Sequence, residues 1–263
     1  MTQHIRQAAV AGTFYPEDAH ELRDMVQGYL SQSSPQSGIA PKAIIAPHAG
    51  YIYSGPVAAS AYINLQSVRD EINKVVLLGP SHRVPLRGIA ASSATHFSTP
   101  LGMIPIDIDG VKLACELPEV QINDEAHAME HSLEVHLPFL QQVLGQFSLV
   151  PLVVGQATPE EVDRVLSRLW DGPETLLVIS SDLSHYHDYE TAKRLDKETS
   201  LAIESLDYKN IQYENACGRD PINGLLHLAK RFGLHAESID LRNSGDTAGT
   251  HDKVVGYGAY LFH

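Results

Sequence analysis

Residues 44–51 of the chain read Ile-Ile-Ala-Pro-His-Ala-Gly-Tyr, and residues 75–82 read Val-Val-Leu-Leu-Gly-Pro-Ser-His. Each stretch is a short apolar run that ends at a proline, and a histidine follows within two residues. Runs of this length bounded by glycine or proline predict strands that are buried on both faces of a sheet. Because ligands of open α/β sheets bind beyond the carboxyl ends of the strands, His48 and His82 are predicted to meet in one site.

Strand-like and helix-like segments alternate along the 263 residues. Apolar runs at residues 149–154 and 176–180 predict two more buried strands, separated by a helix that starts with a capping box at Thr158. Leucines at helical spacing predict a longer helix over residues 130–144, in which Pro138 should cause a bend or lie in a first turn. The alternation shows no clear break, and it predicts a single α/β domain over residues 1–263, with a mostly parallel central sheet flanked by helices.

Composition narrows the class of protein. The formal net charge of -13 argues against a nucleic-acid partner, which would require a basic stripe. No segment reaches the roughly 18 apolar residues that span a bilayer, and residues 1–7 lack the pattern of a signal peptide. The two cysteines, Cys115 and Cys217, are too far apart for a C-x-x-C pair. These features predict a cytoplasmic protein without membrane or nucleic-acid partners.

Two polar residues follow the predicted strand at 176–180. Asp182 is expected to orient an imidazole or to hold a hydrogen bond to a ligand, and His185 to act as a further ligand or as a general acid/base. Histidine is well suited to both tasks, and the chain contains 14 of them. His187, two residues further on, is expected to lie in solvent.

A third group of candidates interrupts the apolar pattern of residues 130–138, which read Glu-His-Ser-Leu-Glu-Val-His-Leu-Pro. His131 and Glu134 are three residues apart and would share one face of a helix, while His136 would lie off that face. The spacing does not match the zinc-protease motif H-E-x-x-H. His131 and Glu134 are therefore predicted to line the wall of a site through hydrogen bonds.

Cys217 precedes a predicted helix that starts near Pro221. A cysteine at a helix N-terminus has a lowered pKa in principle, which favours the thiolate. A thiolate is a soft metal ligand and also a nucleophile, whereas a buried cysteine would be inert. Cys115, inside an apolar helical pattern, is expected to be inert.

Five motifs, in order along the chain, resemble those of the MEMO family, whose bacterial and archaeal members are called AmmeMemoRadiSam system protein B. The similarity extends over essentially the whole chain. It implies a single α/β domain related to the LigB-like class III extradiol dioxygenases, which use non-haem Fe(II). The motifs are residues 46–51, 78–82, 130–138, 180–185 and 217–222.

The resemblance also implies a metal pocket built from His48, His82 and Cys217, with His185 alongside. The dioxygenases use two histidines and a carboxylate, a ligand set that suits Fe(II) and O₂. Here Cys217 takes the place of the carboxylate. A thiolate softens the site toward copper(I), zinc or a differently tuned iron.

The leading hypothesis is therefore a metal-dependent oxidoreductase with a dioxygenase-like site, which acts on a small-molecule substrate and uses Fe(II), with copper or zinc as alternatives. A second hypothesis is a non-catalytic protein that handles metal or binds a peptide in the same pocket. A third is a hydrolase with a cysteine nucleophile and a histidine base. The family name implies AMMECR-type and radical-SAM proteins as genetic neighbours. In the leading hypothesis the metal ligands are His48, His82 and Cys217, the catalytic residues are His185 and Asp182, and the supporting residues are His131 and Glu134.

Overall fold

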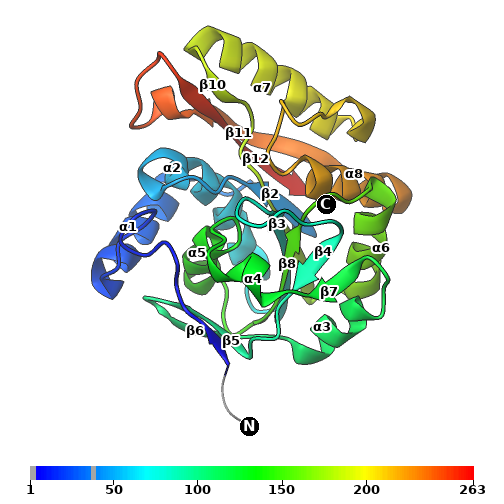
Figure 1. Ribbon diagram of the computed structural model, residues 1–263. Helices are drawn as coiled ribbons and strands as arrows, with labels where there is room; N and C mark the ends of the chain where they lie inside the picture. Colours follow the sequence, from blue (N-terminus) through cyan, green and yellow to red (C-terminus); the bar gives the residue numbers. More distant parts are fainter. Residues whose placement is uncertain (1–3, 37–39) are drawn as a thin grey trace.

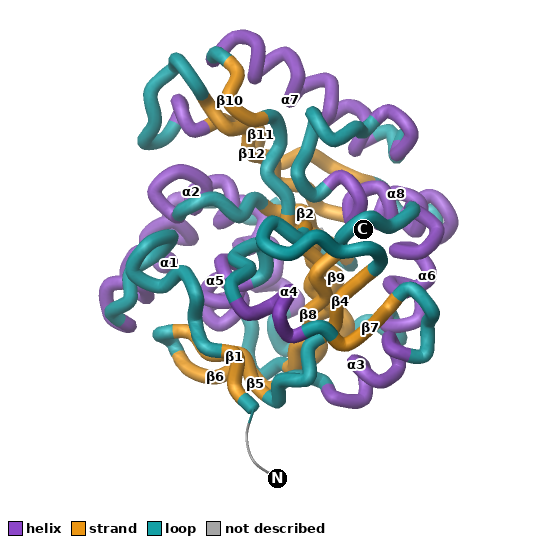
Figure 2. Tube along the Cα trace, in the orientation of Figure 1, coloured by secondary structure: helices purple, strands orange, loops and turns teal. Residues whose placement is uncertain are grey.

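A nine-stranded sheet runs through the centre of the computed structural model, which describes residues 4–36 and 40–263 (Figures 1 and 2). The strand order is β10-β12-β2-β9-β3-β8-β4-β7, and β11 pairs with β12 beside this path. The strands are β2 (Ala43–Ala46), β3 (Lys74–Pro80), β4 (Ile89–Ala91), β7 (Val120–Ile122), β8 (Ser148–Val154), β9 (Thr175–Ser180), β10 (His185–His187), β11 (Ala236–Asn243) and β12 (Val254–Phe262).

The centre of the sheet is parallel and its flanks are antiparallel. Strands β2, β9, β3 and β8 run in the same direction, whereas β12 pairs antiparallel with β2, and β4 pairs antiparallel with β8. The predicted α/β fold with a large central sheet is confirmed. Its parallel part is narrower than expected, because the C-terminal strands β11 and β12 pair antiparallel through a short connection, which parallel strands could not use.

Helices cover both faces of this sheet. Figure 1 shows α1, α2 and α5 on one side, α3, α6 and α8 on the other, and α7 against β11 and β12. Strands β2 and β9 are buried along their whole length, which explains their continuous apolar sequences. The helices are α1 (Ala19–Gln32), α2 (Tyr51–Tyr62), α3 (Ile108–Cys115), α4 (Asp124–Ala128), α5 (Leu137–Val143), α6 (Pro159–Leu169), α7 (Tyr189–Glu204) and α8 (Arg219–Phe232), with 3-10 turns η1 (Ile63–Val68), η2 (Glu134–His136), η3 (Tyr208–Asn210) and η4 (Ser244–Asp246).

A small second sheet carries the N-terminal segment. Strand β1 (Ile5–Arg6) pairs parallel with β5 (His96–Thr99), which forms a hairpin with β6 (Gly102–Pro105). Beyond β1 the chain turns back at Gly12, whose φ of 78° is one that glycine adopts without strain. This arrangement brings residues 6–15 against the segment that follows α4.

The helix predicted over residues 130–144 is confirmed in its C-terminal half and wrong over residues 130–133. Helix α4 ends at Ala128, residues 130–133 are not helical, and α5 starts at Leu137 with Pro138 in its first turn. Proline lacks the N–H that a helix interior needs, and the Glu130 carboxylate accepts the backbone N–H groups of the two residues that follow it. The break leaves His131 in a loop. The capping box predicted at Thr158 is confirmed at the start of α6.

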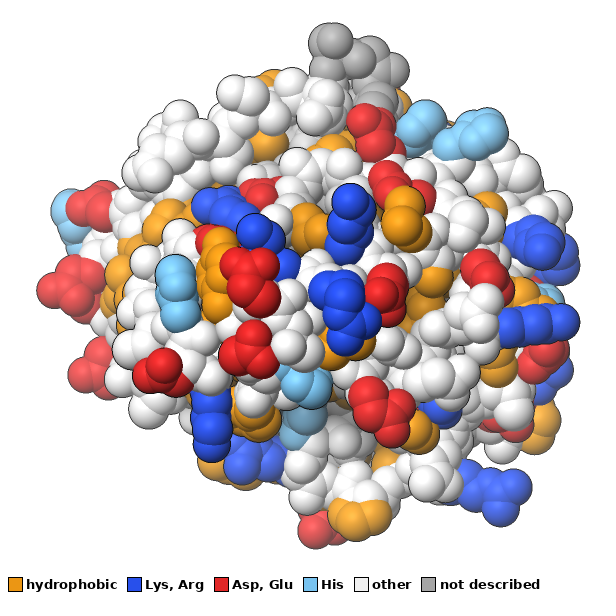
Figure 3. Space-filling model, turned by 90° about the horizontal axis from the view of Figure 1, so that it is seen from above, with side chains coloured by type: hydrophobic (Ala, Val, Ile, Leu, Met, Phe, Trp, Pro, Cys, Tyr) orange, Lys and Arg blue, Asp and Glu red, His pale blue; other side chains and the backbone are white. Residues whose placement is uncertain are grey.

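The surface carries mixed charge. On the face shown in Figure 3, acidic and basic side chains are interspersed with uncharged surface. Within residues 4–36 and 40–263, no helix combines the length and the apolar character needed to cross a membrane.

Candidate metal centre

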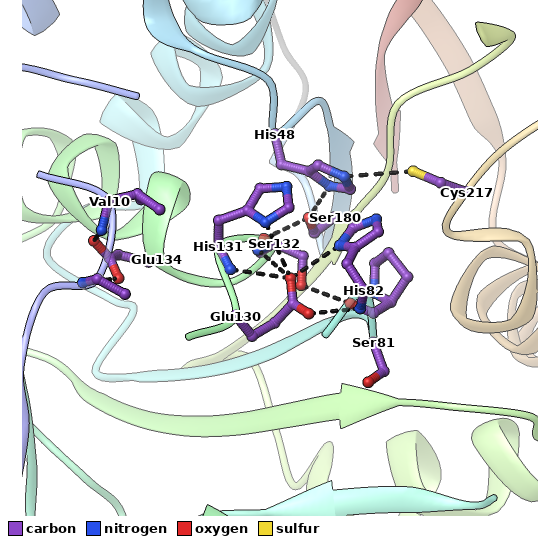
Figure 4. Close-up of polar contacts among 12 residues, drawn as sticks. Val10, His48, Ser81, His82, Glu130, His131, Ser132, Glu134, Ser180 and Cys217 are labelled. Carbon is purple, nitrogen blue, oxygen red and sulfur yellow. Dashed lines mark hydrogen bonds and ion pairs between the residues drawn. The ribbon is translucent and has the colours of Figure 1, made fainter. Parts of the chain in front are cut away.

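Three imidazoles meet beyond the carboxyl ends of the parallel strands. His48 follows β2 and His82 follows β3, while strand β9 lies between the two, so the predicted pair meets across an intervening strand. The ring centroids of His48 and His82 are 5.1 Å apart, and those of His82 and His131 are 4.7 Å apart. One nitrogen from each of the three rings lies within 4.8 Å of the other two (Figure 4). This spacing allows one metal ion to contact all three rings.

Ser180, at the end of β9, fixes the tautomer of His48. Its hydroxyl donates to the Ser132 carbonyl over 2.6 Å, and its oxygen lies 2.6 Å from Nδ1 of His48. Since the only hydroxyl hydrogen is already used, Ser180 must accept a hydrogen bond from the Nδ1–H of His48. The Nε2 lone pair of His48 is therefore available to a ligand.

Glu130 holds His82 in the same way. Its carboxylate accepts from Nδ1 of His82 over 2.9 Å and from the backbone N–H of His82 over 2.6 Å. Burial opposes ionisation of Glu130, but the hydrogen bonds from His82 outweigh it and lower the pKa of the carboxyl to about 2. A carboxylate on the far nitrogen of an imidazole is the usual support of a metal-bound histidine. Sequence reasoning missed Glu130, although it directly precedes His131 in a motif that was singled out.

His131 contributes to the centre directly. Its ring stacks on His82 and contacts Phe14, and its Nδ1 faces the Glu130 carboxylate, with an N–O distance of 3.4 Å. Burial and the neighbouring His82 lower the pKa of His131 to about 4, and burial lowers the pKa of His48 well below its usual value. Both rings are therefore neutral near pH 7, which is the form that binds metal ions.

Glu134 does not take the role expected from the sequence. It is fully buried, but its carboxylate pairs with Arg6 and accepts hydrogen bonds from the Tyr15 hydroxyl at 2.5 Å and from the backbone N–H groups of Ala9 and Val10. The broken helix explains this, because His131 and Glu134 no longer share a helical face. Figure 4 shows Glu134 beside the N-terminal segment and apart from the imidazoles.

Cys217 points toward His48 from the start of α8 (Figure 4). Its Sγ lies 3.4 Å from Nε2 of His48 and 3.6 Å from the carbonyl oxygen of Asp182. Burial and the Asp182 carboxylate raise the pKa of the thiol to about 12, so the helix start does not lower it as the sequence suggested. The close approach depends on Gly218, where a Cβ would lie 2.6 Å from the Ser180 carbonyl oxygen.

Asp182 and His185 line the same cavity as the imidazoles. One carboxylate oxygen of Asp182 accepts the backbone N–H of His48 over 2.8 Å, and the other lies 4.0 Å from Nε2 of His48. Burial raises the pKa of Asp182 to about 6. His185 stands on the short strand β10, which pairs with β12. Both residues can therefore reach a ligand held at the imidazoles.

The cavity has a volume of about 990 Å³ and a largely aromatic wall. His187 also lines it, although it was expected to lie in solvent. His136 is buried elsewhere and shares a hydrogen bond of 2.8 Å between its Nδ1 and the Tyr62 hydroxyl, which gives it a structural role. The aromatic side chains on the wall are Phe14, Tyr53, Tyr186, Tyr213 and Tyr257.

Comparison with known proteins shows the family. A family model described as Memo-like protein matches residues 6–261. The chain belongs to the Memo family. A relative named MEMO1 family protein from Aquifex aeolicus is 38% identical, over 98% of this chain and 99% of its own. Another of that name from Aeropyrum pernix is 39% identical, over 97% of this chain and 98% of its own.

One solved structure is also similar to this Memo-family chain. It is the crystal structure of an uncharacterized protein from Escherichia coli K12, which aligns with a TM-score of 0.48 at 14% sequence identity. The alignment covers 84% of this chain and 99% of that chain.

The donor set of this Memo-family chain fits a first-row transition metal. Two Nε2 lone pairs are available in one cavity with their Nδ1–H groups already held, and a nitrogen of the third imidazole, His131, lies within 4.8 Å of a nitrogen of each. Imidazole and thiol ligands together suit iron, copper or zinc, whereas magnesium and calcium prefer oxygen.

Proposed function

We propose that this Memo-family protein binds one transition-metal ion and acts as a metal-dependent oxidoreductase on a small molecule. His48 and His82 would bind the metal through Nε2, and His131 and Cys217 would complete the ligand set. The observation that carries the proposal is the pair of hydrogen bonds that fix His48 and His82 as Nδ1–H tautomers in one cavity. Fe(II) is the metal we propose, with copper or zinc as alternatives.

The chain's own residues support a reaction in this cavity. A bound metal would supply Lewis acidity and, for iron or copper, one-electron redox chemistry. His185 and Asp182 line the cavity beside the imidazoles, where each can hold or accept a proton of the substrate. Phe14 and Tyr257 supply aromatic surface to the wall of the cavity. The resemblance to ring-cleaving dioxygenases makes a catechol the first substrate to test.

A second candidate is a protein that binds metal without catalysis. It is favoured by Cys217, whose sulfur lies 3.4 Å from Nε2 of His48 in the place where the dioxygenases have a carboxylate. A thiolate there favours copper(I) or zinc. A hydrolase is less well supported, since the imidazole beside Cys217 belongs to His48 and not to His185. We infer a cytoplasmic protein from the composition and the N-terminal sequence, and AMMECR-type and radical-SAM proteins as genetic neighbours from the family name alone.

Metal titration tests the proposal. The protein, the variants His48→Ala and His82→Ala, and the control His20→Ala would each be titrated with Fe(II), Cu(I) and Zn(II) under anaerobic conditions. His20 is exposed on α1, far from the imidazoles in sequence and structure. We expect one tightly bound ion in the protein and in the control, and a loss of at least roughly 100-fold in affinity in the two variants. Equal occupancy in all four proteins would overturn the proposal.

Oxygen uptake separates the first candidate from the second. The Fe(II)-loaded protein would be mixed with a panel of catechols in an oxygen electrode, and the His185→Gln variant would serve as the matched control for proton transfer. Uptake that falls in the variant while iron stays bound supports an oxidoreductase. Intact metal binding without uptake on any catechol favours the metal-binding role.

A further inference from the structure

A second cavity adjoins the metal-binding cavity at Cys217. It has a volume of about 440 Å³, and Cys217 and Tyr213 line both cavities. It lies at the carboxyl ends of β3 and β8, where Pro80 is paired in register with Val154. Figure 4 shows the Ser81 hydroxyl turned away from the imidazoles, toward the loop that forms this cavity, where it donates to the Val84 carbonyl.

The second cavity has apolar side chains on part of its wall, and backbone hydrogen bonds join the segments that form it. Strand β8 continues past Val154 into Gly155, where a Cβ would lie only 2.0 Å from the Leu86 carbonyl oxygen. The two segments are joined by backbone hydrogen bonds from Gly155 to Gly88 and from Gln156 to Leu86, of 2.9 and 2.8 Å. The shape is therefore present before any ligand arrives. The apolar side chains on its wall are Pro80, Val84, Pro85, Leu86, Val154 and Pro221.

The second cavity is also lined by two charged residues, Asp220 and Arg87. Its acidic residue, Asp220, is neutralised by Arg219 over 2.6 Å. Arg87 also lines the cavity, is exposed, and takes part in no ion pair with the residues that the structure describes. A guanidinium at the end of an apolar cavity suits a carboxylate or phosphate.

We propose that the second cavity is the arm of the metal site that binds the tail of the substrate. The substrate would have a metal-binding head at His48 and His82, a short apolar middle beside Leu86, and an anionic end at Arg87. This inference rests on the proposed function, because it needs a metal to hold the head. It adds a substrate class, namely an elongated anionic molecule, and it makes Leu86 and Arg87 determinants of specificity.

Hydroxamates test the arm, because they bind metals at one end and can carry a tail of chosen length. Co(II)-loaded protein would be titrated with acetohydroxamate, butyrohydroxamate, hexanohydroxamate and adipic monohydroxamate, with the visible spectrum of Co(II) as readout. We expect affinity to rise roughly threefold for each methylene that enters the arm. The terminal carboxylate of the adipic compound should add about fivefold over hexanohydroxamate through Arg87.

Variants test whether the gain in hydroxamate affinity comes from the second cavity. Leu86→Trp, with Val84→Phe as a second blocking variant, should abolish the dependence of hydroxamate affinity on chain length. Arg87→Gln should remove only the advantage of the terminal carboxylate. Leu201→Trp and Arg69→Gln, both exposed and outside the two cavities, are the matched controls.

The outcomes separate this inference from the proposed function. If acetohydroxamate does not change the Co(II) spectrum of the unaltered protein, the proposed metal-dependent function is wrong, and the proposed role of the second cavity is wrong with it. If acetohydroxamate binds but chain length has no effect, or if the blocking variants behave like the controls, only the arm is wrong. Length dependence that the blocking variants abolish supports the arm.

Discussion

The Ser180 hydroxyl lies 2.6 Å from Nδ1 of His48, and the two residues come from the ends of neighbouring parallel strands, β9 and β2. Their pairing ties the chemistry of the site to the topology of the sheet. Because β9 runs between β2 and β3, the end of β9 stands between the two imidazole-bearing loops and can orient the nearer ring. The orientation of His48 is thus set by the strand order, before any metal is bound.

Replacing Ser180 by alanine should weaken metal binding. The variant leaves the Nδ1–H of His48 without an acceptor, so the ring is free to change tautomer, and we expect a loss of about 10- to 100-fold in affinity. The free energy of unfolding should fall by roughly 1 to 2 kcal/mol, because two buried groups lose their partner. Zn(II) competition against a chelator measures the first effect, and urea unfolding the second.

Ser167→Ala is the matched control for that prediction. Ser167 donates to Asp163 on α6 and is remote from the imidazoles in the chain order, so its loss should affect stability alone. An equal change in metal affinity in the two serine variants would contradict the role assigned to Ser180.

Replacing Glu130 by glutamine should affect both the metal and the fold. The carboxylate accepts four hydrogen bonds, two from His82 and one each from the backbone of His131 and Ser132. A glutamine side chain would place its NH₂ group, a donor, where one of the carboxylate oxygens now accepts N–H groups. We expect metal affinity to fall by more than about tenfold and stability by roughly 2 to 4 kcal/mol. Loss of stability with unchanged affinity would limit Glu130 to a structural role.

The sequence predicted the strands of the site better than it predicted the helix beside them. The apolar runs before His48 and His82 are diagnostic, because a strand buried on both faces has no polar positions. The run before Asp182 is equally clear. The position of β9 between the other two strands was not predictable, since strand order depends on contacts between segments far apart in the chain.

Residues 130–138 show why the roles of Glu130 and Glu134 were not predicted from the sequence. Leucine spacing extended the predicted helix back to residue 130 and so placed His131 and Glu134 on one face, whereas Pro138 lies in the first turn of α5, as one of the two alternatives expected. In the structure Glu130 replaces the helical hydrogen bonds of this segment, so His131 turns to the metal centre and Glu134 turns to the N-terminal segment. A local pattern cannot report a side chain that competes with the helix for the backbone.

Glu134 is expected to be needed for the N-terminal segment to pack. Its buried carboxylate pairs with Arg6 and accepts the Tyr15 hydroxyl and two backbone N–H groups. Removing one partner of a buried ion pair leaves an uncompensated charge, so Glu134→Gln should lower stability by about 3 to 5 kcal/mol. Tyr15→Phe removes a single hydrogen bond and should lower it by about 1 kcal/mol.

Glu134→Gln should also disturb the metal centre indirectly, through Phe14. Phe14 contacts the ring of His131, and its carbonyl oxygen accepts the backbone N–H of Tyr51 at the start of α2. We therefore expect hydrogen exchange at the backbone N–H groups of residues 9–15 and at Tyr51 to accelerate in Glu134→Gln. Unchanged exchange there, with global stability lowered, would show that Glu134 does not hold this segment.

Asp196 gives a prediction about pH. It is buried on α7 and accepts the backbone N–H of Ser184 over 2.9 Å, and burial raises the pKa of its carboxyl to about 6. In the unfolded chain the pKa is about 3.9. Between these values the folded state binds more protons than the unfolded state, so this group makes the protein less stable as pH rises from about 4 to about 6.

Asp196→Asn removes that penalty, because the amide oxygen can still accept from Ser184 and carries no charge. Above pH 6 the variant should be more stable than the unaltered protein by up to about 2 kcal/mol, and the difference should shrink toward zero near pH 4. Urea unfolding of both proteins across this range measures it. The other titratable groups contribute the same pH dependence to the stability of both proteins, so their contribution cancels in the difference. A stability difference that does not vary with pH would mean that Asp196 is not the group that titrates.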